Sequence, residues 1–204
     1  MKKVISIFMI LSLMFAMTSC FDDDFEDQDL TEIANPITEC KTADELLEAT
    51  GISLDAPEGA SDVIYSFIDT GVAGESLVAQ VEFTLDKNQY CYRAQETGKT
   101  SLLGDVASDS NVSADALTAA MSKAIEEYGE FAGLYDEWGS SASVDIAQTR
   151  EGIVAFNDGK SGFIAWLDVV PGVQYCLSMV EKCTQDLLMT TAEKCFVPMQ
   201  GDAE

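Results

Sequence analysis

The sequence predicts an α+β fold: a mostly antiparallel sheet, folded as a meander, with a short N-terminal helix, an inserted middle helix and a closing C-terminal helix. Short segments rich in β-branched and aromatic residues form two blocks, at 63–94 and 143–179. Helical patterns of apolar residues precede, separate and follow these blocks. The length of 204 residues and the hydrophobic fraction of 47% suit one folded domain, predicted over 37–198.

The first helix is predicted over 43–50. Thr42 and Glu45 have the spacing of a capping box, and Gly51 is placed to end the helix. Residues 86–88 are predicted to form a turn, because Asp and Asn favour turns between two strand-like runs. The first block is therefore expected to hold strands at 63–68, 77–85 and 89–94.

The middle helix is predicted to begin at the N-cap Ser113 and to run to about residue 128. Gly129 and Gly133 weaken the pattern beyond that point, so the 129–140 segment stays open between helix and the start of another strand. The apolar positions recur at steps of three and four: Leu117, Met121, Ala124, Ile125, Tyr128, Ala132 and Tyr135.

The second block is predicted to be a meander that ends in a helix over 184–196. Asn157–Lys160 reads as a hairpin turn and Pro171–Gly172 as another turn. Residues 199–204 are expected to form a frayed tail. The helices are expected to pack on one face of the sheet and to leave the other face concave. The strands of this block are expected at 143–146, 152–156, 162–167 and 173–179.

The first 19 residues have the layout of a secretory signal peptide. Lys2 and Lys3 precede the apolar run Val4–Met17, which is shorter than the roughly 20 apolar residues of a membrane span. The string Met17-Thr18-Ser19-Cys20 resembles the lipobox of bacterial lipoproteins. That resemblance implies that the Cys20 sulfur carries a diacylglyceryl group and that Cys20 begins the mature chain. The alternative is ordinary cleavage nearby, which would give a freely secreted protein.

An acidic tether is predicted over residues 20–36. Its string Phe21–Glu32 carries seven acidic residues, and like charges this dense repel one another and extend a chain. A calcium site is the alternative interpretation, but no D-x-[DN]-x-[DN]-G loop occurs there. The acidic residues are Asp22, Asp23, Asp24, Glu26, Asp27, Asp29 and Glu32.

Composition excludes several classes of function. The net charge of -25 argues against nucleic-acid binding, which needs clustered Lys and Arg. The absence of His excludes a Ser-His-Asp triad, a Cys-His pair and His-ligated zinc. The string Thr97–Thr100 looks like the end of a P-loop, but Arg93 stands where the first glycine is required, so a polar loop is expected. We therefore predict no catalytic, cofactor-binding or metal-ligating residue.

Neighbouring carboxylates occur at Glu126-Glu127 and Asp136-Glu137. Acid–base catalysis needs two carboxyl groups that face each other across a substrate, which sequence neighbours do not. Both pairs are therefore interpreted as solvated surface.

Besides Cys20 the chain has five cysteines. They allow at most two disulfides with one thiol left over, and buried free thiols or a thiolate metal site are the alternatives. The strings Gln89–Tyr92 and Gln174–Leu177 are similar, and each places a cysteine in the middle of a predicted strand. If those two strands are neighbours, their sulfurs can lie on one face. The five cysteines are Cys40, Cys91, Cys176, Cys183 and Cys195.

The body of the chain resembles a group of small lipoproteins and surface proteins of gut Firmicutes that carry a domain without an assigned activity. The strings that carry the resemblance lie at 35–40, 79–85, 89–93 and 163–178. It implies an antiparallel sheet, a closing helix and an extracytoplasmic location, and it transfers no catalytic residue.

These observations favour a non-enzymatic lipoprotein, anchored in the membrane outside the cytoplasm, that binds a protein or small ligand or associates with the envelope. Two other functions remain as alternatives to this binding role. The surplus of acidic residues allows a hydrolase that uses carboxylates alone, with or without a metal. The α+β architecture also allows an extracytoplasmic sensor or regulatory module.

Overall fold

The computed structural model describes residues 36–104, 106, 112–147, 150–170 and 172–196. These residues belong to one compact unit, Asn35–Glu204. The predicted signal peptide, the lipidation residue Cys20, the acidic tether up to residue 35 and the tail 199–204 lie outside the described residues.

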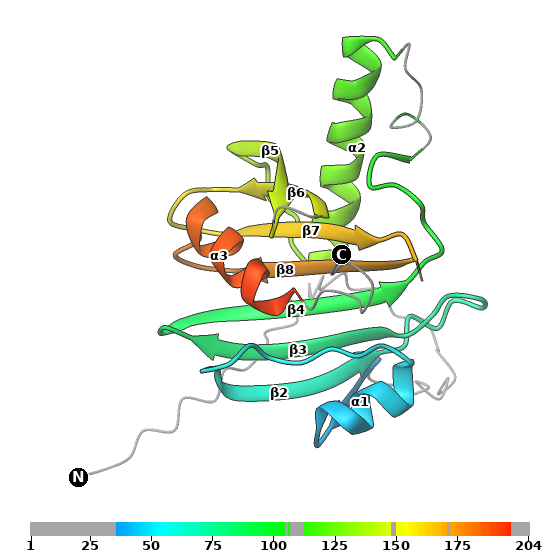
Figure 1. Ribbon diagram of the computed structural model, residues 1–204, viewed down its shortest axis with the longest axis vertical. Helices are drawn as coiled ribbons and strands as arrows, with labels where there is room; N and C mark the ends of the chain where they lie inside the picture. Colours follow the sequence, from blue (N-terminus) through cyan, green and yellow to red (C-terminus); the bar gives the residue numbers. More distant parts are fainter. Residues whose placement is uncertain (1–35, 105, 107–111, 148–149, 171, 197–204) are drawn as a thin grey trace, which may run out of the picture. The chain divides into compact units, whose positions relative to one another are not determined.

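Eight strands form one antiparallel sheet in the order β1-β2-β3-β4-β8-β7-β6-β5 (Figure 1). Together with three helices they confirm the predicted α+β fold with its meander sheet. The strands are β1 (Ile37–Cys40), β2 (Ser61–Ile68), β3 (Val78–Leu85), β4 (Asn88–Glu96), β5 (Ser140–Ile146), β6 (Arg150–Phe156), β7 (Gly162–Asp168) and β8 (Val173–Met179). The helices are α1 (Ala43–Thr50), α2 (Ala114–Ala132) and α3 (Gln185–Cys195).

The sheet consists of two four-stranded meanders, β1–β4 and β5–β8, which meet where β4 pairs with β8. Tyr92 of β4 pairs with Leu177 of β8 at this junction. A two-fold axis normal to the sheet through that pair would superimpose the string Gln89–Tyr92 on Gln174–Leu177. The similarity of the two strings thus corresponds to equivalent places in the two halves of the sheet.

The helices begin where the sequence predicts. The Thr42 side chain accepts a hydrogen bond from the Glu45 backbone N–H at 3.2 Å, and Ser113 and Thr184 act in the same way for α2 and α3. The capping box of α1 is displaced by one residue, because the Glu45 carboxylate accepts from the Lys41 N–H at 2.8 Å instead of from Thr42. Gly51 ends α1 in the left-handed conformation, as predicted.

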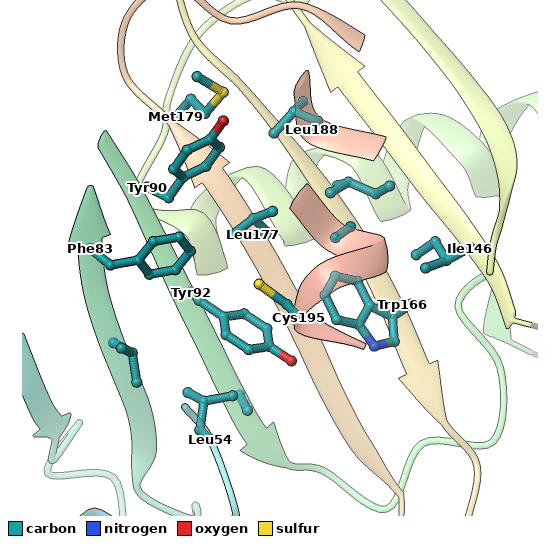
Figure 2. Packing of buried hydrophobic residues seen from close by; sticks show 14 of the residues in the cluster. Leu54, Phe83, Tyr90, Tyr92, Ile146, Trp166, Leu177, Met179, Leu188 and Cys195 are labelled. Atoms are coloured by element: carbon teal, nitrogen blue, oxygen red, sulfur yellow. The ribbon is translucent and has the colours of Figure 1, made fainter. Parts of the chain in front are cut away.

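The expectation that all helices lie on one face of the sheet is wrong. On one face, α3 covers the larger core, and Figure 2 shows Leu188 and Cys195 of α3 above Leu177 and Trp166 of the sheet. On the other face, α2 packs against a second cluster that includes Phe163 of β7. Every residue of β7 is buried. A strand that is apolar on both faces needs a cover on both faces, and this explains the two-sided arrangement.

The helix α2 is longer than predicted. Of the segment 129–140, which the sequence left open between helix and strand, residues 129–132 are helical, 133–139 are neither, and β5 begins at Ser140. The helix continues to Ala132 and ends at Gly133, whose φ is 76°. Gly129 is buried inside it, and a Cβ there would lie 3.2 Å from the Leu134 carbonyl oxygen. Close packing therefore favours glycine at this position despite its low helix propensity.

The short strand β1 has no counterpart in the sequence predictions. It has four residues, three of them exposed, and it lies at the edge of the sheet, where Ile37 pairs with Ile68. Such a segment has no alternation of buried and exposed residues for a pattern to detect. None of the described helices is both long enough and apolar enough to cross a membrane.

Candidate functional site

The described residues line an open groove between α2 and the segment that follows β4, of which residues 98–104 and 106 are described. We call it the α2 groove. Its volume is about 730 Å³, which falls in the range of small-molecule sites. The segment contributes residues 98–104 and 106 to its lining, and the helix contributes Ala116, Ala119, Ala120, Lys123, Ala124 and Glu127.

The groove exists because only the C-terminal half of α2 packs on the sheet. The buried residues of the helix are Ala124, Tyr128, Gly129 and Ala132, whereas residues 114–119 are exposed and extend past the sheet edge (Figure 1). The side chains that face the groove on these first turns are mostly alanines, so they leave open space beside the helix. Opposite them, the half-buried Leu102 and Leu103 connect the groove to the core beneath α2.

The segment that forms the other wall is held at its start by backbone contacts. The Gly172 carbonyl, in the turn between β7 and β8, accepts hydrogen bonds from the N–H groups of Thr97 at 2.9 Å and Gly98 at 3.1 Å. A Cβ on Gly172 would lie 2.9 Å from the Gly98 Cα. The close approach of the two backbones therefore depends on the missing side chain of Gly172, whereas a Cβ on Gly98 would meet nothing within 4 Å. Residues 97–100 are neither helix nor strand, as the interpretation as a polar loop predicts.

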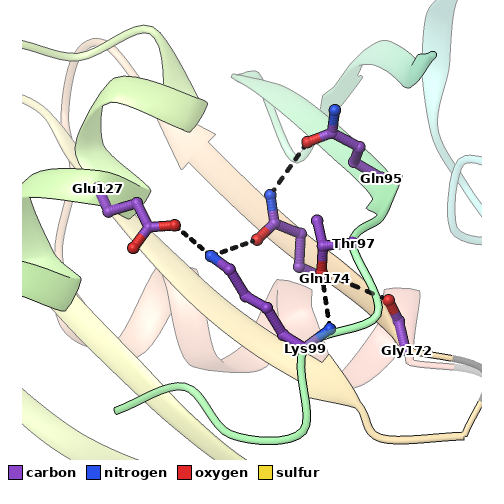
Figure 3. A network of polar contacts seen from close by, with 6 residues as sticks. All are labelled: Gln95, Thr97, Lys99, Glu127, Gly172 and Gln174. Atoms are coloured by element: carbon purple, nitrogen blue, oxygen red, sulfur yellow. Dashed lines mark hydrogen bonds and ion pairs between the residues drawn. The ribbon is translucent and has the colours of Figure 1, made fainter. Parts of the chain in front are cut away.

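Among the residues that the structure describes, three charged side chains line the α2 groove: Lys99, Lys123 and Glu127. Lys99 forms an ion pair with Glu127 and also donates a hydrogen bond of 3.2 Å to Gln174 Oε1 (Figure 3). Its Nζ atom lies 5.2 Å from the ring centroid of Tyr128. These contacts tie the segment to both the helix and strand β8.

Lys123 makes no ion pair with any residue that the structure describes. Glu127 lies four residues further along α2, which is the position of a natural helical partner. Glu127 instead forms its ion pair with Lys99, on the opposite wall of the groove. The described charges lining the groove therefore sum to one unpaired positive charge, in a chain whose net charge is -25.

Buried and half-buried polar side chains beside the groove connect neighbouring strands of the sheet. Gln174 of β8 donates to Gln95 Oε1 at 3.3 Å, and Gln95 donates to the Ser76 carbonyl at 2.9 Å. On the same face, Arg93 of β4 donates to Gln80 Oε1 at 2.7 Å. Buried polar groups are stable only when they are bonded, so these contacts hold the sheet beneath the groove in one arrangement.

The Tyr128 side chain lies under Lys99 and is only 1% exposed. Its hydroxyl has no hydrogen-bond partner among the described residues. Burial raises the pKa of Tyr128, and the nearby Glu127 carboxylate raises it further. At neutral pH the hydroxyl is therefore a neutral donor in an apolar cluster.

All five described cysteines are free thiols. The strands β4 and β8 are neighbours, and Cys91 and Cys176 lie on one face, as the sequence predicts for neighbouring strands. They are not directly opposite, since Cys91 pairs with Ser178 and Cys176 pairs with Arg93. Burial raises the pKa of Cys91 to about 11 and raises that of Cys176 further. The thiols on this face are thus protonated and weakly nucleophilic at neutral pH.

The remaining cysteines lie on the other side of the sheet and at its edge. Cys183 precedes α3 and Cys195 ends it, both buried, and burial raises the pKa of each to about 12. Cys40, at the end of β1, is partly exposed, and its pKa is also raised. Within the described residues no three His, Cys, Asp or Glu side chains are grouped to hold a metal ion.

The neighbouring carboxylates named from the sequence are exposed residues. Glu127 bonds to Lys99, and Asp136 accepts a hydrogen bond from the Ser161 hydroxyl. Asp168 is the one buried carboxylate of the described residues, and Arg150 donates to it at 2.8 Å. The described carboxylates therefore give no facing pair in a cleft.

Sequence reasoning missed the α2 groove. A groove arises from the distance between two segments, and only one signal pointed to it: alanines occupy exposed positions in the first turns of a helix. Comparison with known proteins adds no assignment, since no protein-family model, curated protein or solved structure matches this chain.

Proposed function

We propose that this chain is a non-enzymatic binding module, located outside the cytoplasm and held at the membrane by a lipid on Cys20, whose ligand binds in the α2 groove. The observation that carries the binding role is the groove itself. It combines an apolar lining with few charged groups, and ligand sites commonly have this composition. The lipobox-like string Met17–Cys20 supports the anchor.

The binding role is tested by filling the groove. Ala119 lines the groove and Ala114 does not, yet both are exposed residues of α2. Leucine is a good helix former, so Ala119→Leu and Ala114→Leu should both keep the helix. We expect a small-molecule extract of the host to yield a ligand, detected by mass spectrometry, that the wild type and Ala114→Leu retain and Ala119→Leu loses. Retention of that ligand by Ala119→Leu, or recovery of no ligand at all, would count against the binding role.

The anchor is tested by labelling cells with an alkyne fatty acid. We expect the label on the wild type and on Cys40→Ala, a matched cysteine variant, and no label on Cys20→Ala. The unlabelled variant should also leave the membrane fraction. A wild-type protein that is unlabelled and found in the medium would instead support the secreted alternative.

The two other hypotheses are weaker. The carboxylate hydrolase has no supporting pair of facing carboxylates in the described residues. The sensor module has only the general architecture in its favour. No specific observation supports either of them over the binding module.

A further inference from the structure

We infer that the α2 groove takes a small amphiphile with a single negative charge, of the class of alkyl carboxylates. The inference rests on the proposed function and names the ligand class of that same site. The ligand's apolar chain would lie along the alanine side of α2, and its carboxylate would bind the ammonium group of Lys123.

Two of the three described charged groups in the groove are already paired with each other. Glu127 and Lys99 neutralise each other across the groove, and Lys99 is also bonded to Gln174. Lys123 is left without an ionic partner among the described residues, and it lines the groove. An anionic head group would gain a charge-assisted hydrogen bond from it, whereas a cationic head group would be repelled.

The strong negative charge of the chain does not reverse this preference. At physiological ionic strength the Debye length is about 8 Å, so distant carboxylates act weakly on a bound head group. The charges that line the groove act at shorter range. Among the described lining residues only Lys123 carries an unpaired positive charge, and this favours a ligand with one negative charge over one with several.

Both walls of the groove carry apolar side chains. Ala116, Ala119 and Ala120 form the helix wall, and Leu102, Leu103 and Val106 lie in the other wall. None of these six side chains can donate or accept a hydrogen bond. A chain of methylene groups is favoured in such surroundings, because each buried methylene adds about 0.8 kcal/mol, or about fourfold in affinity.

The experiment is a titration of the chain from residue 20 onward, which contains the whole compact unit, with Cys20→Ser so that no lipid is attached. The probes are decanoate, octanoate, decyl glucoside and decylamine, each below its micelle concentration, and binding is measured by calorimetry and ligand-observed NMR. We expect decanoate to bind best. Octanoate, two methylene groups shorter, should bind on the order of tenfold more weakly. Decyl glucoside and decylamine should bind more weakly than decanoate.

Variants test the contact with the ligand's head group separately from the contact with its alkyl chain. Lys123→Gln should weaken decanoate binding by up to about fivefold and leave decyl glucoside binding unchanged. Lys160→Gln, at an exposed lysine outside the groove, should change neither. Ala119→Leu should weaken both, while its urea unfolding midpoint stays that of the wild type.

The outcomes distinguish the ligand class from the function. Equal binding of decanoate and decyl glucoside, with no effect of Lys123→Gln, would overturn the carboxylate class and leave an apolar binding groove. Preference for decylamine would overturn it as well. Binding of no probe, together with a host ligand that Ala119→Leu loses, would overturn the alkyl class and keep the proposed function. Probe binding that Ala119→Leu does not weaken would overturn the site.

Discussion

The guanidinium group of Arg93, in strand β4, donates a hydrogen bond of 2.6 Å from Nη1 to the backbone carbonyl of Phe131, in the last turn of α2. The C-terminal end of a helix carries partial negative charge on its unpaired carbonyls, and cations nearby stabilise it. The last turn of α2 has no basic residue of its own. The sheet therefore supplies the cation that the helix lacks, and Gly133 leaves room for it, since a Cβ there would lie 3.2 Å from Nη1.

Replacement of Arg93 should destabilise the fold through two lost partners. In Arg93→Met the Phe131 carbonyl and the Gln80 side chain each lose a hydrogen bond to a charged group. We expect the free energy of unfolding to fall by about 2–3 kcal/mol, measured by urea denaturation. Arg93→Lys keeps the positive charge but lacks the planar guanidinium group with its several N–H donors. Its free energy of unfolding should therefore fall by less than that of Arg93→Met. A change below about 0.5 kcal/mol in Arg93→Met would show that this contact does not hold α2 to the sheet.

The parts of the fold that the sequence predicts are those set by residues close together in the chain. The caps Thr42, Ser113 and Thr184 lie next to the helices that they begin. The hairpin of β3 and β4 follows from alternation and from the turn predicted at 86–88, although Asn88 already pairs with Leu85 and the turn itself has two residues. Each of these depends on backbone hydrogen bonds within a few residues, so a local pattern is enough to identify it.

The parts that the sequence did not predict depend on partners far apart in the chain. Arg93 was noticed only as the residue that breaks a P-loop pattern, and its partner Phe131 is 38 residues away. A side chain on Gly172 would meet the backbone of Gly98, 74 residues earlier, and a side chain on Gly129 would meet Leu134 and Trp138. Propensity alone treats each glycine as a helix breaker or a loop residue, although close packing is its actual role.

The contact between Gly172 and Gly98 predicts a difference between two glycine variants. Gly172 and Gly159 both lie in hairpin turns with positive φ, but a Cβ at Gly159 meets nothing within 4 Å. We expect Gly159→Ala to lose about 1–2 kcal/mol of unfolding free energy, from its backbone conformation alone. Gly172→Ala should lose more, because its Cβ would lie 2.9 Å from the Gly98 Cα. Equal losses in urea denaturation would contradict the role of close approach.

The turn between β3 and β4 predicts a stabilising substitution. Asp86 and Lys87 both have positive φ, at 50° and 68°, which side chains other than glycine adopt at a cost. Lys87→Gly should relieve that cost and raise the free energy of unfolding by about 1 kcal/mol, seen as a higher melting temperature. Lys160→Gly, at a turn lysine outside the positive-φ region, should be neutral or destabilising. A lower melting temperature in Lys87→Gly would contradict the argument.

The five free cysteines predict a specific pattern of alkylation in the protein from its own host. If the thiols are free as in the structure, unfolding without reductant should expose five of them to alkylation. In the native state at pH 8, Cys40 should react first, because the other partly exposed thiol, Cys91, has a pKa that burial raises to about 11. Cys91, with its pKa raised to about 11, is then a thiolate in only about one molecule in a thousand, so its reaction should speed up about tenfold per pH unit. Each disulfide would remove two alkylated thiols from the mass of the unfolded chain, so a count of three or one would establish the oxidised alternative.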